Sequence, residues 1–129
     1  MAARKIIGVI DDESDLVQLF SDALKAAGFK TMGFSDPLAA TKYISSHPGD
    51  FSLVLTDWRM PKMTGIELAG LISRINSDIK VVLMSAYELD QDELKEIQKD
   101  DYLKKPIHIA KLLEAVKTQL FSERVIEAE

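Results

Sequence analysis

Short apolar runs alternate with segments of helical period about five times along the chain. Such alternation is typical of repeated βα units, in which parallel strands form one sheet and helices cover it. We therefore predict an α/β fold with a parallel sheet. The expected strands span residues 5–10, 30–34, 51–57, 80–84 and 101–103, and the expected helices span residues 16–27, 37–46, 65–75, 89–99 and 109–120.

Local signals indicate where several of these elements begin and end. Gly28 follows the first helix at a position where a left-handed backbone is common. Asp36 is expected to cap the second helix, and Pro37 suits its first position, where a missing N–H costs nothing. The unbroken apolar run Leu53–Leu55 predicts a central strand that is buried on both faces. Because Leu89–Lys99 has few apolar residues, we expect the weakest and most mobile helix there.

Chemically active residues stand where four of the expected strands end. Asp11 and Asp12 follow the first strand, Asp57 ends the third, Ser85 follows the fourth and Lys105 comes after the fifth. Because the carboxyl ends of parallel strands lie at one edge of the sheet, we expect these side chains to converge. Carboxylates at close range disfavour joint ionisation unless a cation neutralises them. The pattern therefore predicts a divalent-metal site with a reactive carboxylate.

The residue types at this edge also indicate the chemistry. Carboxylate oxygens suit Mg²⁺, which is held by a few carboxylates, waters and phosphate oxygens. An aspartate beside Mg²⁺ can attack phosphorus and form an acyl phosphate, whose oxygens Lys105 and Ser85 can then bind. We therefore predict phosphoryl transfer through positioning and charge neutralisation.

Composition excludes several other classes of function. The chain has no cysteine, which excludes disulfides, thiolate metal sites and thiol redox chemistry. A formal net charge of -5 argues against direct binding of nucleic acid. The sequence shows neither a signal peptide nor a membrane span, so we expect a soluble, cytoplasmic chain. Its size fits one domain at residues 1–121, followed by a frayed tail or the start of a linker at residues 122–129.

These motifs, taken together, resemble the receiver domain of two-component response regulators. The resemblance spans about Arg4–Leu120, and its strength lies in the joint order and spacing of the motifs. It implies a flavodoxin-like, doubly wound, five-stranded parallel sheet in the order 2-1-3-4-5, flanked by five helices. The motifs are Asp11-Asp12, Asp57 within Thr-Asp-Trp-Arg-Met-Pro, Ser85-Ala86, Tyr102 and Lys105-Pro106.

The resemblance implies a phosphorelay signalling switch rather than an enzyme acting on separate substrates. Asp57 would accept a phosphoryl group from a sensor histidine kinase or a histidine phosphotransfer protein, and later lose it by hydrolysis. Mg²⁺ would be coordinated directly by Asp12, Asp57 and the backbone carbonyl of Arg59, and by Asp11 through a water molecule. The chain would be a monomer or weak dimer and would make no contact with nucleic acid or membrane.

The same resemblance assigns the remaining residues to phosphoryl binding and to a conformational switch. Lys105 would pair with the phosphoryl oxygens, and Ser85 would hydrogen-bond one of them. Tyr102 would turn inward once the Ser85 hydroxyl moves. The face formed by the fourth helix, the last strand and the fifth helix would then change its affinity for a downstream protein target.

The sequence departs from the usual pattern of this family in two places. Residues Gln98–Asp100 stand where the family commonly has a Gly-Ala pair, and the interval from Ser85 to Lys105 is about two residues shorter than usual, so we expect a remodelled fourth helix. Arg59 and Tyr87 occupy positions that, in the family that this chain resembles, influence how water reaches the acyl phosphate. Because a long cation and a bulky ring could shield the phosphorus, we predict slow dephosphorylation.

Other functional classes remain possible on the residues alone. A haloacid-dehalogenase-like phosphatase also uses an aspartate nucleophile with Mg²⁺, but it needs Asp-x-Asp after the first strand, whereas Asp11 and Asp12 are adjacent. A flavodoxin-like electron carrier would need a phosphate-binding first loop, which Asp-Asp-Glu would repel. A phosphorylation-independent adaptor with the same fold ranks below a working receiver, because every key acidic, hydroxyl and lysine position is filled.

Overall fold

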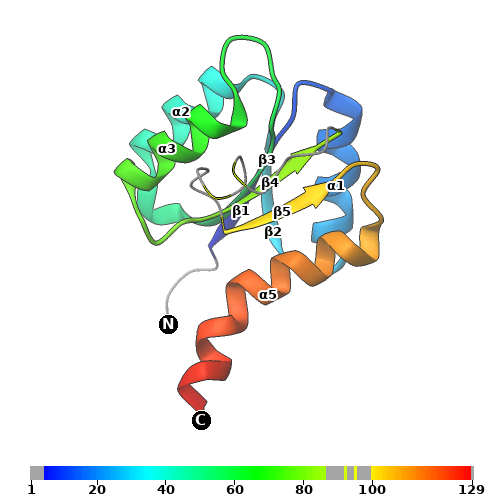
Figure 1. Cartoon of the computed structure of the whole chain (residues 1–129), viewed down its shortest axis with the longest axis vertical. Coiled ribbons are helices and arrows are strands. Elements are labelled where there is room, and N and C mark those ends of the chain that lie inside the picture. The colour runs from blue at the N-terminus through cyan, green and yellow to red at the C-terminus, as the bar shows by residue number, and fades with distance from the viewer. Residues whose placement is uncertain (1–4, 87–91, 93–94, 96–99, 129) are drawn as a thin grey trace.

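The computed structural model describes residues 5–86, 92, 95 and 100–128, of which residues 122–128 are described as backbone only. Its strands form one five-stranded parallel sheet in the order β2-β1-β3-β4-β5 (Figure 1). This arrangement confirms the predicted fold class and strand order. The strands are β1 (Ile6–Ile10), β2 (Lys30–Phe34), β3 (Phe51–Asp57), β4 (Lys80–Ser85) and β5 (Asp101–Lys104).

Helices cover both faces of the sheet, as the doubly wound pattern requires (Figure 1). The helices α2 and α3 pack on one face, and α1 and α5 pack on the other. The expected fourth helix at Leu89–Lys99 lies outside the described residues, apart from positions 92 and 95. The described helices are α1 (Ser14–Ala26), α2 (Pro37–Ser46), α3 (Gly65–Ile75) and α5 (Ile109–Ala128), with a short 3₁₀ turn at Pro48–Asp50.

The ends of these helices match the local sequence signals, with one exception. The Asp36 carboxylate accepts a hydrogen bond of 3.0 Å from the backbone N–H of Leu38, which confirms it as the N-cap of α2. Gly28 follows α1 with a φ of 99°, a conformation that glycine adopts without strain. The exception is α5, which continues as a helix to Ala128. The helix thus runs past the end at Leu120 that its apolar period predicted, and the assignment of residues 122–129 to a tail or the start of a linker stays a prediction.

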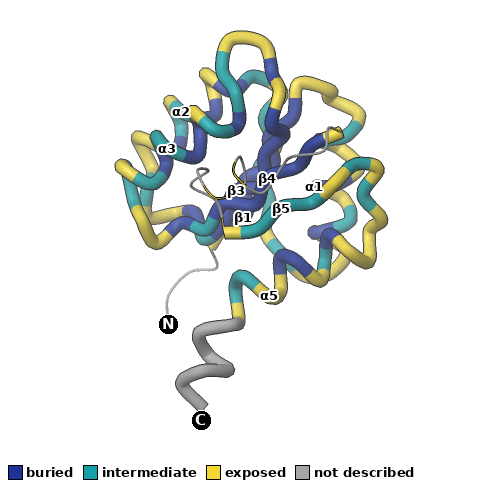
Figure 2. Tube along the Cα trace, in the orientation of Figure 1, coloured by how far each residue is buried: buried dark blue, intermediate teal, exposed yellow. Residues whose placement is uncertain are grey.

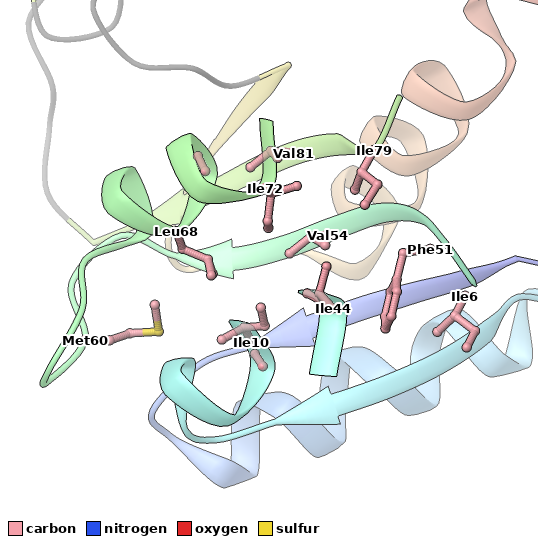
Figure 3. Packing of buried hydrophobic residues seen from close by; sticks show 12 residues of the cluster. Ile6, Ile10, Ile44, Phe51, Val54, Met60, Leu68, Ile72, Ile79 and Val81 are labelled. Atoms are coloured by element: carbon pink, nitrogen blue, oxygen red, sulfur yellow. The ribbon is translucent and has the colours of Figure 1, made fainter. Parts of the chain in front are cut away.

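Two layers of apolar side chains hold the sheet to its helices. In one layer, Ile10 and Val54 from the sheet meet Ile44 of α2 and Leu68 and Ile72 of α3 (Figure 3). The other layer lies between the opposite face of the sheet and the helices α1 and α5. The central strand β3 is buried at every position except Ser52, as its unbroken apolar run predicted (Figure 2). Strand β5, at the edge, is only half-buried.

The register of the strands aligns their carboxyl ends. Ile10 of β1 pairs with Thr56 of β3, and Asp57 pairs with Met84 of β4. Ser85 pairs in turn with Lys104 of β5. The residues at or just after these ends, which carry the acidic, hydroxyl and lysine side chains, are therefore neighbours in space. Within the part of the chain that the structure describes, no helix combines the length and apolarity needed to cross a bilayer.

Candidate functional site

Three carboxylates converge at the carboxyl edge of the sheet. Asp11 and Asp12 follow β1, and Asp57 ends β3. One carboxylate oxygen from each lies within 4.8 Å of the others. Asp11 is fully buried and Asp57 is only 8% exposed, whereas Asp12 faces solvent. The convergence expected from the strand ends is therefore present, and its inner part lies below the protein surface.

Both oxygens of the buried Asp11 already have partners in the protein. Its Oδ1 accepts a hydrogen bond of 2.9 Å from the backbone N–H of Glu13, and its Oδ2 accepts one of 2.9 Å from the Lys105 ammonium. Buried carboxylates are costly unless they are satisfied in this way. Asp11 therefore serves as an anchor for its neighbours, and Asp12 and Asp57 are the carboxylates better placed for direct contact with a cation.

Lys105 links two strands through a single ammonium group. Its Nζ lies 2.9 Å from Asp11 Oδ2 and 3.1 Å from Asp57 Oδ1, and its side chain is only 16% exposed. The backbone N–H of Lys105 donates a hydrogen bond of 2.7 Å to the carbonyl of Ser85, and the peptide bond to Pro106 is cis. The ammonium is thus an internal partner of the acidic cluster rather than a solvated charge.

The protonation energetics of the cluster follow from this crowding. Burial, followed by repulsion from Asp11, raises the pKa of Asp57, and the hydrogen bond and charge of Lys105 only partly offset these effects. Burial alone would lower the pKa of Lys105, but its hydrogen bonds and ion pairs with Asp11 and Asp57 outweigh that effect and raise it. The ammonium therefore stays charged, whereas the carboxylate of Asp57 lacks full compensation.

A hollow of about 230 Å³ opens above the acidic cluster. Ser85 reaches it from the end of β4 and is only 1% exposed, whereas Arg59 is exposed at its rim. The site thus combines carboxylates, a hydroxyl and two cationic side chains in a space large enough for a phosphoryl group. Its lining consists of Asp12, Glu13, Leu16, Asp57, Arg59, Ser85, Ala86 and Lys105.

Of the predicted site residues that the structure describes, Asp11 and Tyr102 do not line this hollow. Tyr102 lies on β5 beside Leu83 of β4 and is half-buried in a small apolar cluster with Trp58 and Ile66. It is therefore separated from Asp57 by one strand. Tyr87 lies outside the described residues, so its predicted influence on dephosphorylation stays a prediction.

The structure also places residues at the site that sequence reasoning missed. The backbone N–H of Gly65 donates a hydrogen bond of 2.6 Å to the carbonyl of Trp58, which brings the start of α3 against the end of β3. A Cβ atom at Gly65 would overlap the carbonyl oxygen of Asp57. The Thr64 side chain caps the same helix. The Thr-Gly pair that ends the loop after Asp57 was the signal available in the sequence, because glycine permits a close backbone approach.

The donor set of this site fits Mg²⁺. All its anionic groups are carboxylates, and oxygen donors of this kind are those that Mg²⁺ prefers. The ammonium of Lys105 neutralises only part of the charge of Asp11, Asp12 and Asp57, which leaves the cluster anionic. A divalent cation would complete that neutralisation. The exposed Asp12 would also give it access from solvent.

Comparisons with known proteins agree with this geometry. The family model of the response regulator receiver domain matches residues 7–117. The response regulator receiver protein CpdR of Brucella abortus is 29% identical over 123 residues, and the match covers 92% of this chain and 98% of CpdR. Sporulation initiation phosphotransferase F of Bacillus subtilis is 32% identical over 122 residues, which cover 93% of this chain and 96% of that protein. The chain is also similar to the crystal structure of the response regulator protein TrrA from Thermotoga maritima in complex with Mg²⁺-BeF. The two structures have a TM-score of 0.79 and 31% sequence identity, and the match covers 90% of this chain and 99% of TrrA.

Proposed function

Because the chain belongs to the family of response regulator receiver domains, we propose that it is a phosphorelay switch that accepts a phosphoryl group on Asp57. The observation that supports this most directly is the position of Lys105, whose Nζ contacts Asp57 Oδ1 at 3.1 Å inside a hollow of about 230 Å³. A carboxylate with an adjacent ammonium and room for a phosphoryl group is the arrangement that phosphoryl transfer needs.

In the proposed reaction, a carboxylate oxygen of Asp57 attacks the phosphorus of a phosphohistidine on a sensor kinase or a histidine phosphotransfer protein. A new P–O bond forms as the P–N bond breaks, and the electron pair of that bond returns to the imidazole nitrogen. Mg²⁺, when bound, neutralises charge on the carboxylates and the phosphoryl oxygens. Asp12, Asp57 and the carbonyl of Arg59 would hold it directly, and Asp11 through a water molecule.

Lys105 and Ser85 would then bind the transferred group. The ammonium of Lys105 already lies beside Asp57, so it needs only a small movement to reach the new phosphoryl oxygens. Ser85 lines the same hollow and is 1% exposed, which makes its hydroxyl a buried hydrogen-bond donor for one of these oxygens. Buried charge-assisted hydrogen bonds of this kind are about twice as strong as neutral ones.

The signal would leave the site through the adjacent strands β4 and β5. A phosphoryl group adds roughly one and a half to two negative charges and three acceptor oxygens. Ser85 pairs with Lys104, and Leu83 pairs with Tyr102, so a shift of Ser85 reaches the β5 backbone and the Tyr102 ring through direct neighbours. The resulting coupling is about 1–3 kcal/mol, and partial activation without phosphate is expected. The affected surface would include α5 and would bind a downstream protein.

The lifetime of the acyl phosphate would depend on how water reaches the phosphorus. Arg59 is exposed at the rim of the hollow, where its long side chain can cover the phosphoryl group. We therefore expect a shorter half-life in an Arg59→Asn, Tyr87→Glu variant, followed by the decay of radiolabelled phosphoprotein. An unchanged or longer half-life in this variant would contradict the shielding role. Dephosphorylation would be the chain's own hydrolysis of Asp57, without turnover of a separate substrate.

The setting proposed for this switch is the cytoplasm, where sensor kinases present their phosphohistidine. Residues 1–121 would form the receiver, acting as a monomer or weak dimer, and residues 122–129 would form a tail or the start of a linker. A formal net charge of -5 argues against direct contact with nucleic acid. Output would therefore pass through protein contacts.

Replacement of the phosphoacceptor tests the proposal. Asp57→Asn should abolish labelling by ³²P-acetyl phosphate and by a phosphorylated histidine kinase in the presence of Mg²⁺, because an amide cannot act as the nucleophile. Asp50→Asn is the matched control, because Asp50 precedes the opposite end of the same strand β3 and the substitution removes the same charge. Full labelling of Asp57→Asn, or equal loss in both variants, would refute Asp57 as the acceptor.

A further inference from the structure

Asp100 forms an unusual set of contacts at the start of β5. Its backbone N–H donates a hydrogen bond of 2.7 Å to the carbonyl of Val81, and its carboxylate Oδ2 accepts one of 2.7 Å from the N–H of the same residue. Its own carbonyl accepts a hydrogen bond of 3.1 Å from the Gln119 side chain of α5. We call these three hydrogen bonds the Asp100 clamp. It joins β4, β5 and α5 at one residue.

The Asp100 carboxylate extends the hydrogen-bond ladder between β4 and β5 beyond the residues that the two backbones pair. The pairing of β4 with β5 runs from Val82 and Asp101 to Ser85 and Lys104. Val81, one residue earlier, is 2% exposed, and a buried N–H without a partner is costly. The Asp100 side chain provides that partner where β5 has not yet begun. A Gly-Ala pair, the common sequence near this point in the family, would offer no carboxylate for this bond.

Strand β5 needs such a restraint because it is the shortest strand of the sheet. It has only four residues, lies at the edge of the sheet and is half-buried. Its opposite end is held by the hydrogen bond of 2.7 Å from the Lys105 N–H to the Ser85 carbonyl. The two restraints are about 16 Å apart along an extended chain. Between them they set the register of β5 against β4.

That register determines where the ammonium of Lys105 lies. Its contacts of 2.9 and 3.1 Å with Asp11 and Asp57 leave little tolerance. A slip of one residue would move Lys105 by about 3.3 Å along the strand and would also reverse its side. Even partial fraying at the Asp100 end would widen the range of positions that the ammonium samples.

We propose that Asp100 is a positioning residue for phosphoryl transfer, because the Asp100 clamp fixes β5 and thereby holds Lys105 against Asp57. This role rests on the proposed function of Asp57 as phosphoacceptor. Because the Gln119 side chain belongs to the Asp100 clamp, α5 is part of the same restraint. A partner that displaces α5 would therefore also make the position of Lys105 less well defined. Where the family commonly has a Gly-Ala pair before β5, this chain thus has the Asp100 clamp at the start of the strand.

Kinetics of Asp57 labelling by acetyl phosphate with Mg²⁺ provide the first test. Asp100→Ala should lower the labelling rate by about tenfold, because small misplacements of a charged group are costly in phosphoryl transfer. Asp100→Asn keeps an oxygen acceptor for the Val81 N–H and should stay within about twofold of the parent rate. Asp78→Ala is the matched control, because Asp78 also precedes a strand at the amino edge of the sheet and its carboxylate makes no hydrogen bond or ion pair with the described residues. It should leave the rate unchanged.

A double-variant cycle tests whether Asp100 acts through Lys105. In a Lys105→Ala background, Asp100→Ala should lower the remaining rate by less than about twofold, because the group that it positions is already gone. A further tenfold loss in that background would overturn the proposal. So would an unchanged rate in Asp100→Ala alone, or an equal loss in Asp78→Ala, which would indicate a general charge effect.

Amide hydrogen exchange tests the clamp independently of phosphoryl transfer. Asp100→Ala should speed exchange at Val81 and also at Lys105 by about fivefold or more, whereas Asp78→Ala should change neither. Gln119→Ala, which removes only one bond of the clamp, should cause a smaller increase at the same two amides. Acceleration confined to Val81 would mean a purely local role and would overturn the proposal. If the parent chain is not labelled at Asp57 while both amides respond, the clamp stands and the proposed function fails.

Discussion

Removal of the Lys105 ammonium should destabilise the fold in a way that depends on pH. Lys105→Met keeps the length of the side chain but leaves the buried Asp11 and Asp57 without their shared cation. At separations of 2.9 and 3.1 Å, each contact is worth about 5 kcal/mol before desolvation, with an effective dielectric constant of about 20. Desolvation offsets much of this. Breaking a buried pair from one side costs about 3–5 kcal/mol, and the partial exposure of this lysine favours the lower end, near 3 kcal/mol.

The sign of the pH dependence follows from the direction of the pKa shift. Burial and repulsion from Asp11 already raise the pKa of Asp57 above its usual value near 3.8, and loss of Lys105 removes the contacts that oppose this increase. A carboxyl with a raised pKa binds its proton more tightly in the folded state. The tighter proton binding by Asp57 therefore stabilises the folded state below pH 3.8. This stabilisation is lost as the pH rises through the folded-state pKa of Asp57. The destabilisation by Lys105→Met should accordingly be larger at pH 8 than at pH 5.

Urea unfolding at both pH values, in EDTA to remove divalent cations, measures this difference. The variant should lose about 3 kcal/mol at pH 8 and clearly less at pH 5, with unchanged m-values. Adding Asp57→Asn should recover part of the loss at pH 8, because it removes one of the uncompensated charges. A loss below about 0.5 kcal/mol, or an equal loss at both pH values, would refute the view that Lys105 is a buried counterion.

Three further predictions follow from other contacts. Mg²⁺ at a hundredfold excess over its Kd should stabilise the fold by about 2.7 kcal/mol in thermal unfolding, and Asp57→Asn should reduce this gain; an identical gain in that variant would place the ion elsewhere. Gly65→Ala should cost about 1–3 kcal/mol, because the added Cβ meets the Asp57 carbonyl, whereas Gly49→Ala has open space and should change little; equal effects in urea unfolding would contradict the close approach. Ser21→Ala should stabilise the fold by about 1 kcal/mol, because the buried Ser21 hydroxyl has no hydrogen-bond partner among the described residues; destabilisation would reveal a partner.

Much of the site could be predicted because it depends on strand ends alone. Once Asp11, Asp57 and Ser85 were placed at the ends of parallel strands, their convergence followed from topology without any side-chain detail. Asp36 and Gly28 were equally readable, because caps act through local backbone geometry. These predictions required only the alternation of apolar runs with segments of helical period and the chemistry of single residues.

The features that escaped prediction depend on how separate segments meet. The ammonium of Lys105 contacts both Asp11 and Asp57. This shared contact depends on how deeply the Asp11 side chain is buried, which no local sequence pattern encodes. The Asp100 clamp needs a carboxylate to face Val81, the second residue of β4, which is distant in sequence. The length of α5 was underestimated because residues 122–128 lack a regular apolar face, although their Glu, Arg and Ala residues favour helix by intrinsic propensity.

The burial of the strands differs sharply across the site. Asp57 ends β3, which is buried along nearly its whole length at the middle of the sheet, whereas Lys105 follows the short, half-exposed strand β5. Asp57 therefore ends a rigid central strand, and its counterion Lys105 follows a less tightly packed one. When the charge at Asp57 changes, the mechanical response should fall on the less tightly packed side. In the proposed switch, this asymmetry would direct the movement away from the centre of the sheet and toward its outer edge.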